Sequence, residues 1–110
     1  MSASVRVGGI MRLDGVSPRV YASIRNTFFG VEIRPSARKH GVTDEDLLHA
    51  AKRQLVAVRL EDNGGPPREL RIGPSMAGNL LEIVVVLRDD GEESIIHGMK
   101  LRPKYLGLLP

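Results

Sequence analysis

Residues 79–103 constrain the fold most, because they hold two β-rich runs around one turn signal. The first run, 80–87, is almost continuously apolar and β-branched, which is typical of a strand covered on both faces. The second run, 94–101, is shorter and mixes apolar with charged residues. Asp90 and Gly91 between them favour a hairpin turn, since glycine adopts a positive φ without steric cost. The sequence therefore predicts a hairpin at the centre of a small sheet.

Two helical segments are expected earlier in the chain. Residues 31–34 alternate as a short strand, and Ser36 is the expected cap of one tight turn after it. Thr43 precedes three acids, a strong helix start, because a hydroxyl caps the first turn and acids complement the helix dipole. We therefore predict a helix over residues 44–53. Its expected apolar stripe is Leu47, Leu48, Ala51 and Leu55.

Two further stretches, 54–61 and 68–73, alternate apolar and polar residues and are predicted as strands on either side of a Gly- and Pro-rich loop. In the second, Arg68 shares the apolar face, whereas Arg71 lies on the opposite face and is expected in solvent. The tail after residue 103 is expected to form one turn that packs Tyr105 and Leu106 on the sheet.

Helical segments followed by a run of strands predict an α+β domain. We expect a small, curved antiparallel sheet of about four to five strands, packed against one or two N-terminal helices. The chain has 110 residues, which allows one domain with a modest core. It has no cysteine, which excludes disulfides and thiol catalysis and fits a reducing cytoplasm. No membrane span or signal peptide is recognisable, so a cytoplasmic location is expected.

Residues 1–30 differ from the rest in charge. They hold four arginines and one aspartate, so the net charge of +3 comes from this segment, and residues 31–110 are formally neutral. Glycine and proline interrupt its short apolar stretches, and no helical or strand period persists. We expect a poorly ordered basic leader ahead of a single domain at 31–110, with a nucleic-acid-binding arm as the alternative.

The candidate functional residues are cationic. His40 follows Arg38 and Lys39, a cluster that can hold a phosphate while the imidazole moves a proton near neutral pH. The alternative is a solvated helix end, where cations favour the dipole. Arg68, beside apolar neighbours, either reaches into a site or extends along a strand end.

His97 is the candidate in the last strand, where it is expected to share a face with Ile95 and Met99. A lone histidine on an apolar strand is more often structural than catalytic. Lys100 and Arg102 can serve a phosphate, because arginine matches it with two parallel hydrogen bonds and lysine acts as a point charge. Surface placement explains these two cations equally well.

The three histidines His40, His49 and His97 match no metal-binding spacing, and no glycine-rich loop of phosphate-binding type is present. No metal or cofactor is therefore expected.

Three stretches together resemble the BrnT toxins. The segment RKHGV at 38–42, followed by an acidic helix start, is similar to their RKHGV-S-x-E-E segment. Residues 68–85 are similar to their E-R-x-x-x-I-G-x-S…G-R-L-L-x-V-V pattern, and residues 95–100 fall where they carry R-I-I-S-A-R. The order and the gaps agree over residues 31–105, and the resemblance includes none of the leader.

BrnT toxins belong to the RelE-like ribonuclease toxins of type II toxin–antitoxin systems. The resemblance implies a RelE-like domain that cleaves RNA, including ribosome-associated mRNA, without metal or cofactor. It implies neutralisation by an antitoxin, with operator DNA bound only through that antitoxin. No membrane partner is expected, because no apolar run is long enough to span a membrane. The implied reaction is attack of a ribose 2′-hydroxyl on the adjacent phosphate, which needs a base, an acid and cations. The implied catalytic residues are Lys39, His40, Arg68, His97 and Lys100, and the implied RNA-binding residues are Arg38, Arg71 and Arg102.

The chain departs from the family pattern at specific places. Met99 stands where the family has an arginine, and Asn79 replaces a usual basic residue. These departures support an alternative, a catalytically degenerate domain of the same fold that acts as a protein- or nucleic-acid-binding module. Family members begin near the strand at 31–33, so Val31 is an alternative start that would make residues 1–30 an over-extended leader.

Overall fold

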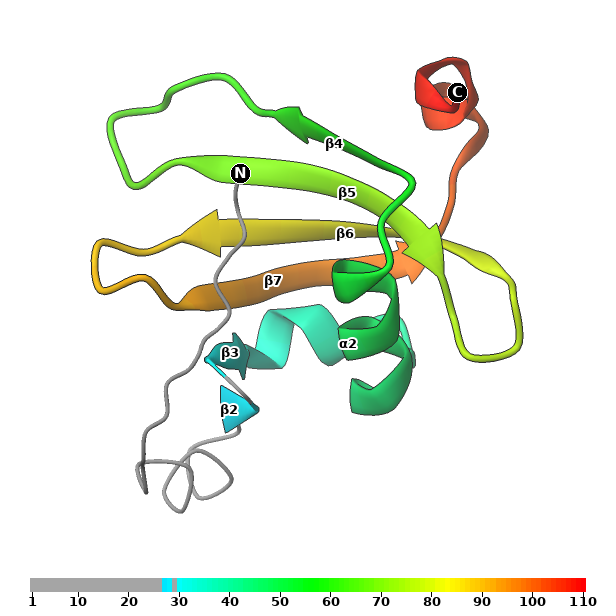
Figure 1. Cartoon of the computed structure of the whole chain (residues 1–110), viewed down its shortest axis with the longest axis horizontal. Coiled ribbons are helices and arrows are strands. Elements are labelled where there is room, and N and C mark those ends of the chain that lie inside the picture. The colour runs from blue at the N-terminus through cyan, green and yellow to red at the C-terminus, as the bar shows by residue number, and fades with distance from the viewer. Residues whose placement is uncertain (1–26, 29) are drawn as a thin grey trace.

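The computed structural model describes residues 27–28 and 30–110, which form a mixed six-stranded sheet with helices beside it (Figure 1). The strand order is β2-β3-β7-β6-β5-β4, which puts β7 and β6 at the centre. The elements are β2 (Thr27–Phe28), β3 (Val31–Ile33), the 3₁₀ helix η2 (Pro35–Arg38), α2 (Asp44–Lys52), β4 (Val56–Arg59), β5 (Arg68–Pro74), β6 (Leu80–Leu87), β7 (Glu93–Lys100) and the 3₁₀ helix η3 (Pro103–Leu108).

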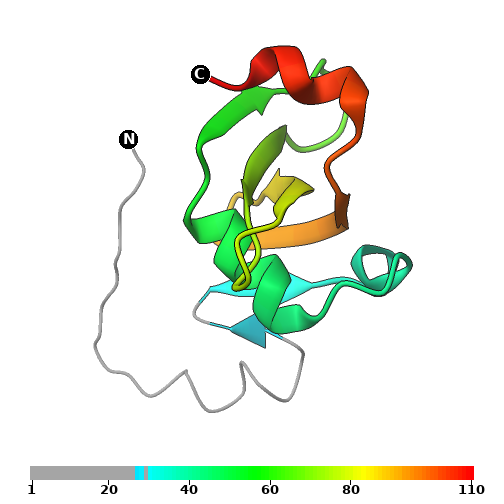
Figure 2. The ribbon, with the colours of Figure 1, turned by 90° about the vertical axis from the view of Figure 1, so that its right-hand side faces the viewer.

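The α+β class and the curved, unclosed sheet are confirmed (Figure 2). Strands β4 to β7 form the predicted antiparallel meander, and Gly91 in the β6–β7 turn has a φ of 84°. The expectation of a wholly antiparallel sheet was wrong at one pair of strands, because β3 pairs with β7 in parallel. The chain between these two strands is long and contains α2, so a parallel pairing is sterically available.

The sheet includes two residues of the predicted leader, which form β2. Strand β2 pairs with β3, so the sheet begins before residue 31. The other residues of the predicted leader, 1–26 and 29, lie outside the described residues. Among those that the structure describes, no helix is both long and apolar enough to cross a membrane.

The helix start at Thr43 is confirmed. The Thr43 hydroxyl accepts a hydrogen bond from the Asp46 N–H at 3.2 Å, and α2 begins at the next residue. The predicted stripe was wrong at Leu55, which is 54% exposed because the helix ends at Lys52. The expected Ser36 cap was also wrong: Ser36 lies inside η2, and its hydroxyl donates to the Ile96 carbonyl at 2.6 Å.

Helix α2 packs very closely on one face of the sheet. Leu47, Ala50 and Ala51 are buried where α2 packs on β5 and β6. Two glycines permit this approach: a Cβ on Gly73 would overlap the Ala50 carbonyl oxygen, and one on Gly98 would overlap the Leu47 side chain. The buried core on this face is Val31, Ile33, Ala37, Leu47, Ala50, Ala51, Leu81, Ile83, Val85 and Ile95.

A bulge in β7 changes which residues share a face. Val84 pairs with His97 and Val85 with Ile95, which leaves Ile96 as the extra residue. An extra residue reverses the alternation of side chains beyond it. The expectation that Ile95 and His97 share a face was therefore wrong, because Ile95 is buried under the helices and His97 lies on the opposite face.

The opposite face of the sheet carries apolar residues of β5 together with Glu82 of β6 and His97 of β7. Leu70 and Ile72 are buried there, as expected for the apolar side of β5. Helix η3 lies toward the β4 end of the molecule, away from α2 (Figures 1 and 2). Tyr105 is half-buried, but the expectation that Leu106 packs on the sheet was wrong, because Leu106 is 54% exposed.

Arg71 is buried on the helix face, so the expectation that it lies in solvent was wrong. Its guanidinium contacts Glu93 at 2.7 Å and Glu69 at 2.9 Å, and it donates to the Ala51 carbonyl at 3.3 Å. Burial by itself lowers the pKa of Arg71, but the bonds to Glu93 and Glu69 outweigh burial and hold the pKa above its usual value. The guanidinium thus donates a hydrogen bond to a carbonyl in the last turn of α2 and links β5 to β7.

Substituting Gly73 with alanine should destabilise the protein more than other glycine substitutions. The added methyl group would meet backbone, which cannot rotate away, so we expect the free energy of unfolding to fall by about 3 kcal/mol. Urea denaturation measures the change. Gly107→Ala is the control, because no atom lies within 4 Å of the added group. A Gly73→Ala protein as stable as wild type would contradict the close approach of α2.

Removing the Arg71 guanidinium should leave Glu69 and Glu93 close together without a counter-charge. We expect Arg71→Ala to lower the free energy of unfolding by about 3 kcal/mol. Arg59→Ala, on the exposed edge strand β4, should change it by less than about 0.5 kcal/mol. Equal effects of the two substitutions in thermal or urea denaturation would show that the ion pairs around Arg71 contribute nothing specific.

Candidate functional site

Two histidines from distant parts of the chain meet beside β7, past the point where its pairing with β3 ends. Strand β3 ends at Ile33, and η2 continues next to β7, where Ser36 holds the carbonyl of the bulged residue. The turn after η2 brings His40 against His97, with their ring centres 5.6 Å apart and the rings nearly perpendicular. His40 is exposed, and His97 is half-buried.

Behind His97 lies the buried carboxylate of Glu82, which belongs to the central strand β6. Glu82 pairs with Met99 across the sheet, so its side chain lies on the same face as His97. The Glu82 carboxylate has no exposed surface, and one of its oxygens, Oε2, lies 2.9 Å from His97 Nε2. A buried carboxylate at this distance orients the imidazole.

Arg102 supplies the remaining partners of Glu82. Its backbone N–H donates to Oε1 at 3.0 Å, and its guanidinium donates to Oε2 at 2.6 Å through Nη2. Burial by itself raises the pKa of Glu82, but the hydrogen bonds from Arg102 and His97 outweigh it and hold the pKa below its usual value. The Arg102 guanidinium also lies 5.7 Å from the ring centre of Tyr105, within cation–π range.

Of the predicted catalytic residues, the structure brings His40 and His97 together. Lys39 is exposed next to His40. Arg68 lies on the same face as His97, two strands away and two residues along, which is about 12 Å for ordinary strand spacing. Lys100 pairs with Leu81 and therefore lies on the opposite face of the sheet from His97. Lys100 does not join the two histidines.

The predicted RNA-binding arginines are all engaged in ion pairs. Arg71 is enclosed by Glu69 and Glu93, and Arg38 makes two hydrogen bonds of 2.8 Å to Asp44. The Arg38 hydrogen bonds hold the pKa of Asp44 below its usual value. Arg102 alone among the three lies at the histidine pair, where its side chain keeps 42% of its surface exposed.

Glu82 is the member of this site that sequence reasoning missed. The available signal was an acidic residue inside the otherwise apolar run LLEIVVVL. A carboxylate on a strand covered on both faces is rare unless it is paired. Its partners, His97 and Arg102, come from the neighbouring strand and the segment after it, so the pairing depends on the register of β6 against β7.

The arrangement combines three chemical abilities. Two imidazoles at one place can accept one proton and donate another. The carboxylate behind His97 stabilises the imidazolium that forms when His97 accepts a proton. The outer part of the Arg102 guanidinium can hold an anionic group, since only its Nε and Nη2 donate to Glu82 within the described part of the chain.

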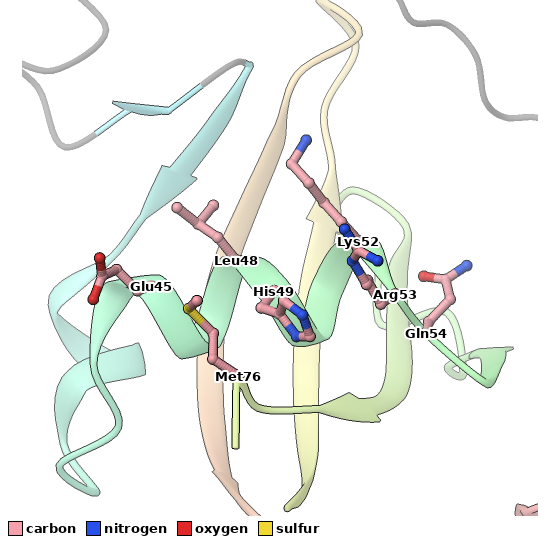
Figure 3. A pocket seen from close by; sticks show the side chains of 7 residues that line it. All are labelled: Glu45, Leu48, His49, Lys52, Arg53, Gln54 and Met76. Carbon is pink, nitrogen blue, oxygen red and sulfur yellow. The ribbon is translucent and has the colours of Figure 1, made fainter. Parts of the chain in front are cut away.

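A separate open groove of about 730 Å³ runs along the outer surface of α2 (Figure 3). Its lining comes from α2 and the residues just after it, together with Met76 from the turn after β5. His49 in this groove lies 2.7 Å from the Pro74 carbonyl through Nδ1, which must donate because a carbonyl only accepts. The groove contains none of the predicted site residues.

Across residues 27–28 and 30–110, no three histidine, aspartate or glutamate side chains gather in a way that could hold a metal ion. Comparison of the chain with protein-family models, with curated proteins and with solved structures finds no match.

The pKa of Glu82 makes an acid-dependent contribution to stability. Because its folded pKa lies below the ordinary value of 4.5, its ionisation stabilises the fold at higher pH, and this contribution is lost as the pH falls through the folded pKa. We expect Glu82→Gln to cost about 2 kcal/mol near pH 7. The gap to wild type should narrow between about pH 5 and about pH 3 in urea denaturation.

The exposed Glu61→Gln is the matched control for this measurement and should follow wild type at every pH. A stability gap for Glu82→Gln that stays constant down to about pH 3 would contradict a lowered pKa for Glu82.

Proposed function

We propose that this chain is the toxin of a type II toxin–antitoxin pair and that it cleaves RNA at the His40–His97 site. The observation that carries the proposal is the meeting of two imidazoles, one backed by a buried carboxylate, on a surface that also holds an arginine. The resemblance to BrnT toxins supports the same reaction, since the RKHGV segment contributes His40 and the last strand contributes His97.

The reaction is a transfer within one RNA strand. The base takes the proton of a ribose 2′-hydroxyl, and the 2′-oxygen forms a bond to the adjacent phosphorus while the bond from phosphorus to the 5′-oxygen breaks. The acid returns a proton to that 5′-oxygen. The products are a 2′,3′-cyclic phosphate and a 5′-hydroxyl, and the chain's own side chains suffice for both proton transfers, in keeping with a metal-independent reaction.

We assign His97 as the base and His40 as the acid. The Glu82 carboxylate stabilises the charge that His97 gains as it accepts the proton. His40 is exposed and can recover its proton from solvent. Arg102 provides the cation that stabilises the negative charge developing on the phosphate. It takes the role of the family arginine, whose position Met99 occupies. Lys100 cannot take this role, because it lies on the other face of the sheet. Arg68 and Lys39 would bind neighbouring parts of the RNA.

The partners follow from this function. The RNA substrate can be ribosome-associated mRNA, and a protein antitoxin would neutralise the toxin and alone contact operator DNA. The toxin and its antitoxin would act in the cytoplasm, where mRNA is accessible.

A second function, a binding module of the same fold without catalysis, is favoured by two observations. Met99 replaces the family arginine, and Arg68 lies about 12 Å from His97 rather than beside it. The same fold would then hold a protein or nucleic acid without cutting RNA.

Purified protein should cut an RNA oligonucleotide in the presence of EDTA and leave a 2′,3′-cyclic phosphate. Loss of an acid or base costs about 100-fold or more in rate, so His97→Ala and His40→Ala should reduce cleavage by at least that factor. His49→Ala, in the groove on α2, is the matched control and should cut normally. A substrate with 2′-deoxyribose at the cleaved position should remain intact.

Expression in a bacterium tests the toxin independently of the choice of oligonucleotide. Induced wild type should stop growth and deplete mRNA, whereas His97→Ala and Arg68→Ala should not. Growth without mRNA loss on wild-type expression would overturn the toxin function. Sequestration of RNA without cutting, with His97→Ala binding as well as wild type, would favour the binding module.

A further inference from the structure

Glu82 lies in the middle of β6, a central strand whose other residues are all apolar. Leu81 and Ile83 on either side of Glu82 are buried, and Glu82 has no exposed surface. Removing a carboxylate from water is costly unless charged and hydrogen-bonding partners replace the water. Both oxygens of Glu82 have such partners, and one of those partners is the histidine assigned as the base.

The hydrogen bonds determine which nitrogen of His97 holds the proton. Arg102 donates to both oxygens of Glu82 through its backbone and its guanidinium, so the carboxylate is ionised and can only accept. His97 Nε2, at 2.9 Å from Oε2, must therefore be the donor. In a neutral imidazole one nitrogen donates and the other accepts, so the unprotonated nitrogen is Nδ1.

We propose that Glu82 is a positioning residue that fixes His97 in the Nε2–H tautomer and thereby makes Nδ1 the atom that takes the 2′-hydroxyl proton. The inference rests on the proposed function for its chemical consequence. The Nδ1 lone pair accepts the proton as the 2′-oxygen bonds to phosphorus, and the 5′-oxygen leaves with a proton from His40. The resulting imidazolium keeps its Nε2–H bond to Glu82, and it returns its extra proton to solvent after release of the product.

The competing explanation is that Glu82 only ties Arg102 and η3 to the sheet. The two explanations differ in what glutamine would do at this position. A glutamine oxygen can still accept a hydrogen bond from Arg102, so the link between Arg102 and the sheet is largely retained. Its amide group can instead donate toward His97 Nε2, which favours a proton on Nδ1. Glu82→Gln therefore separates the role in fixing the tautomer from the structural role.

The tautomer can be read directly from nitrogen chemical shifts of the full-length protein labelled with ¹⁵N-histidine. In the neutral form of the His97 imidazole, we expect the proton on Nε2. His49 provides an internal reference of the opposite kind, because its Nδ1 donates to the Pro74 carbonyl. His97→Asn and His49→Gln assign the signals. In Glu82→Gln the His97 signals should move toward the Nδ1–H form or a mixture.

Cleavage by Glu82→Gln should fall by at least about 100-fold, because the wrong nitrogen then carries the proton. The His49 signals should be the same in this variant as in wild type, which confirms that the domain is folded. Neutral wild-type His97 with its proton on Nδ1 would overturn the inference, as would a Glu82→Gln protein that keeps both the wild-type tautomer and full cleavage. The tautomer is measured without RNA, so its result does not depend on the nuclease assay. A failure of the nuclease assay would overturn the proposed function but would leave the assignment of the tautomer unaffected.

Discussion

The pairing of β6 with β7 is the interaction on which the rest of the structure depends. It places Ile83 and Val85 under α2 on one face and Glu82 beside His97 on the other. The helix face of β6 is buried, so a shift of one residue would exchange its buried apolar side chains with the Glu82 carboxylate. Such a shift would bury Glu82 against the helices without partners, which is a strong penalty against any other register.

The two faces of the sheet have different roles. The helix face is closed by the contacts of α2 at Gly73 and Gly98, and by Arg71, whose guanidinium joins the sheet to the end of the helix. The opposite face keeps His97 half-buried and Arg102 partly exposed, so that these groups remain accessible. A site built on strands is held more firmly than one built on loops alone.

The bulge at Ile96 connects the two faces. Before it, Ile95 belongs to the core beneath the helices; after it, His97 lies on the open face and Gly98 admits Leu47. Without the extra residue, His97 would lie under the helices with Ile95, and the η2 turn could not bring His40 to it. The carbonyl of the bulged Ile96 accepts a hydrogen bond from the Ser36 hydroxyl. This bond holds η2 beside β7, where the turn after η2 brings His40 to His97.

The sequence alone determined the elements whose signals are local. The β6–β7 hairpin, the α2 start at Thr43 and the alternating strands follow from turn chemistry, capping and periodicity, and all of these act within a few neighbouring residues. The tertiary structure alone decided the parallel β3–β7 pairing, the burial of Arg71 and the separation of Lys100 from His97. It also decided the grouping of His40, Glu82, His97 and Arg102, because contacts between distant residues depend on register and on one bulge, and neither leaves a local signal in the chain.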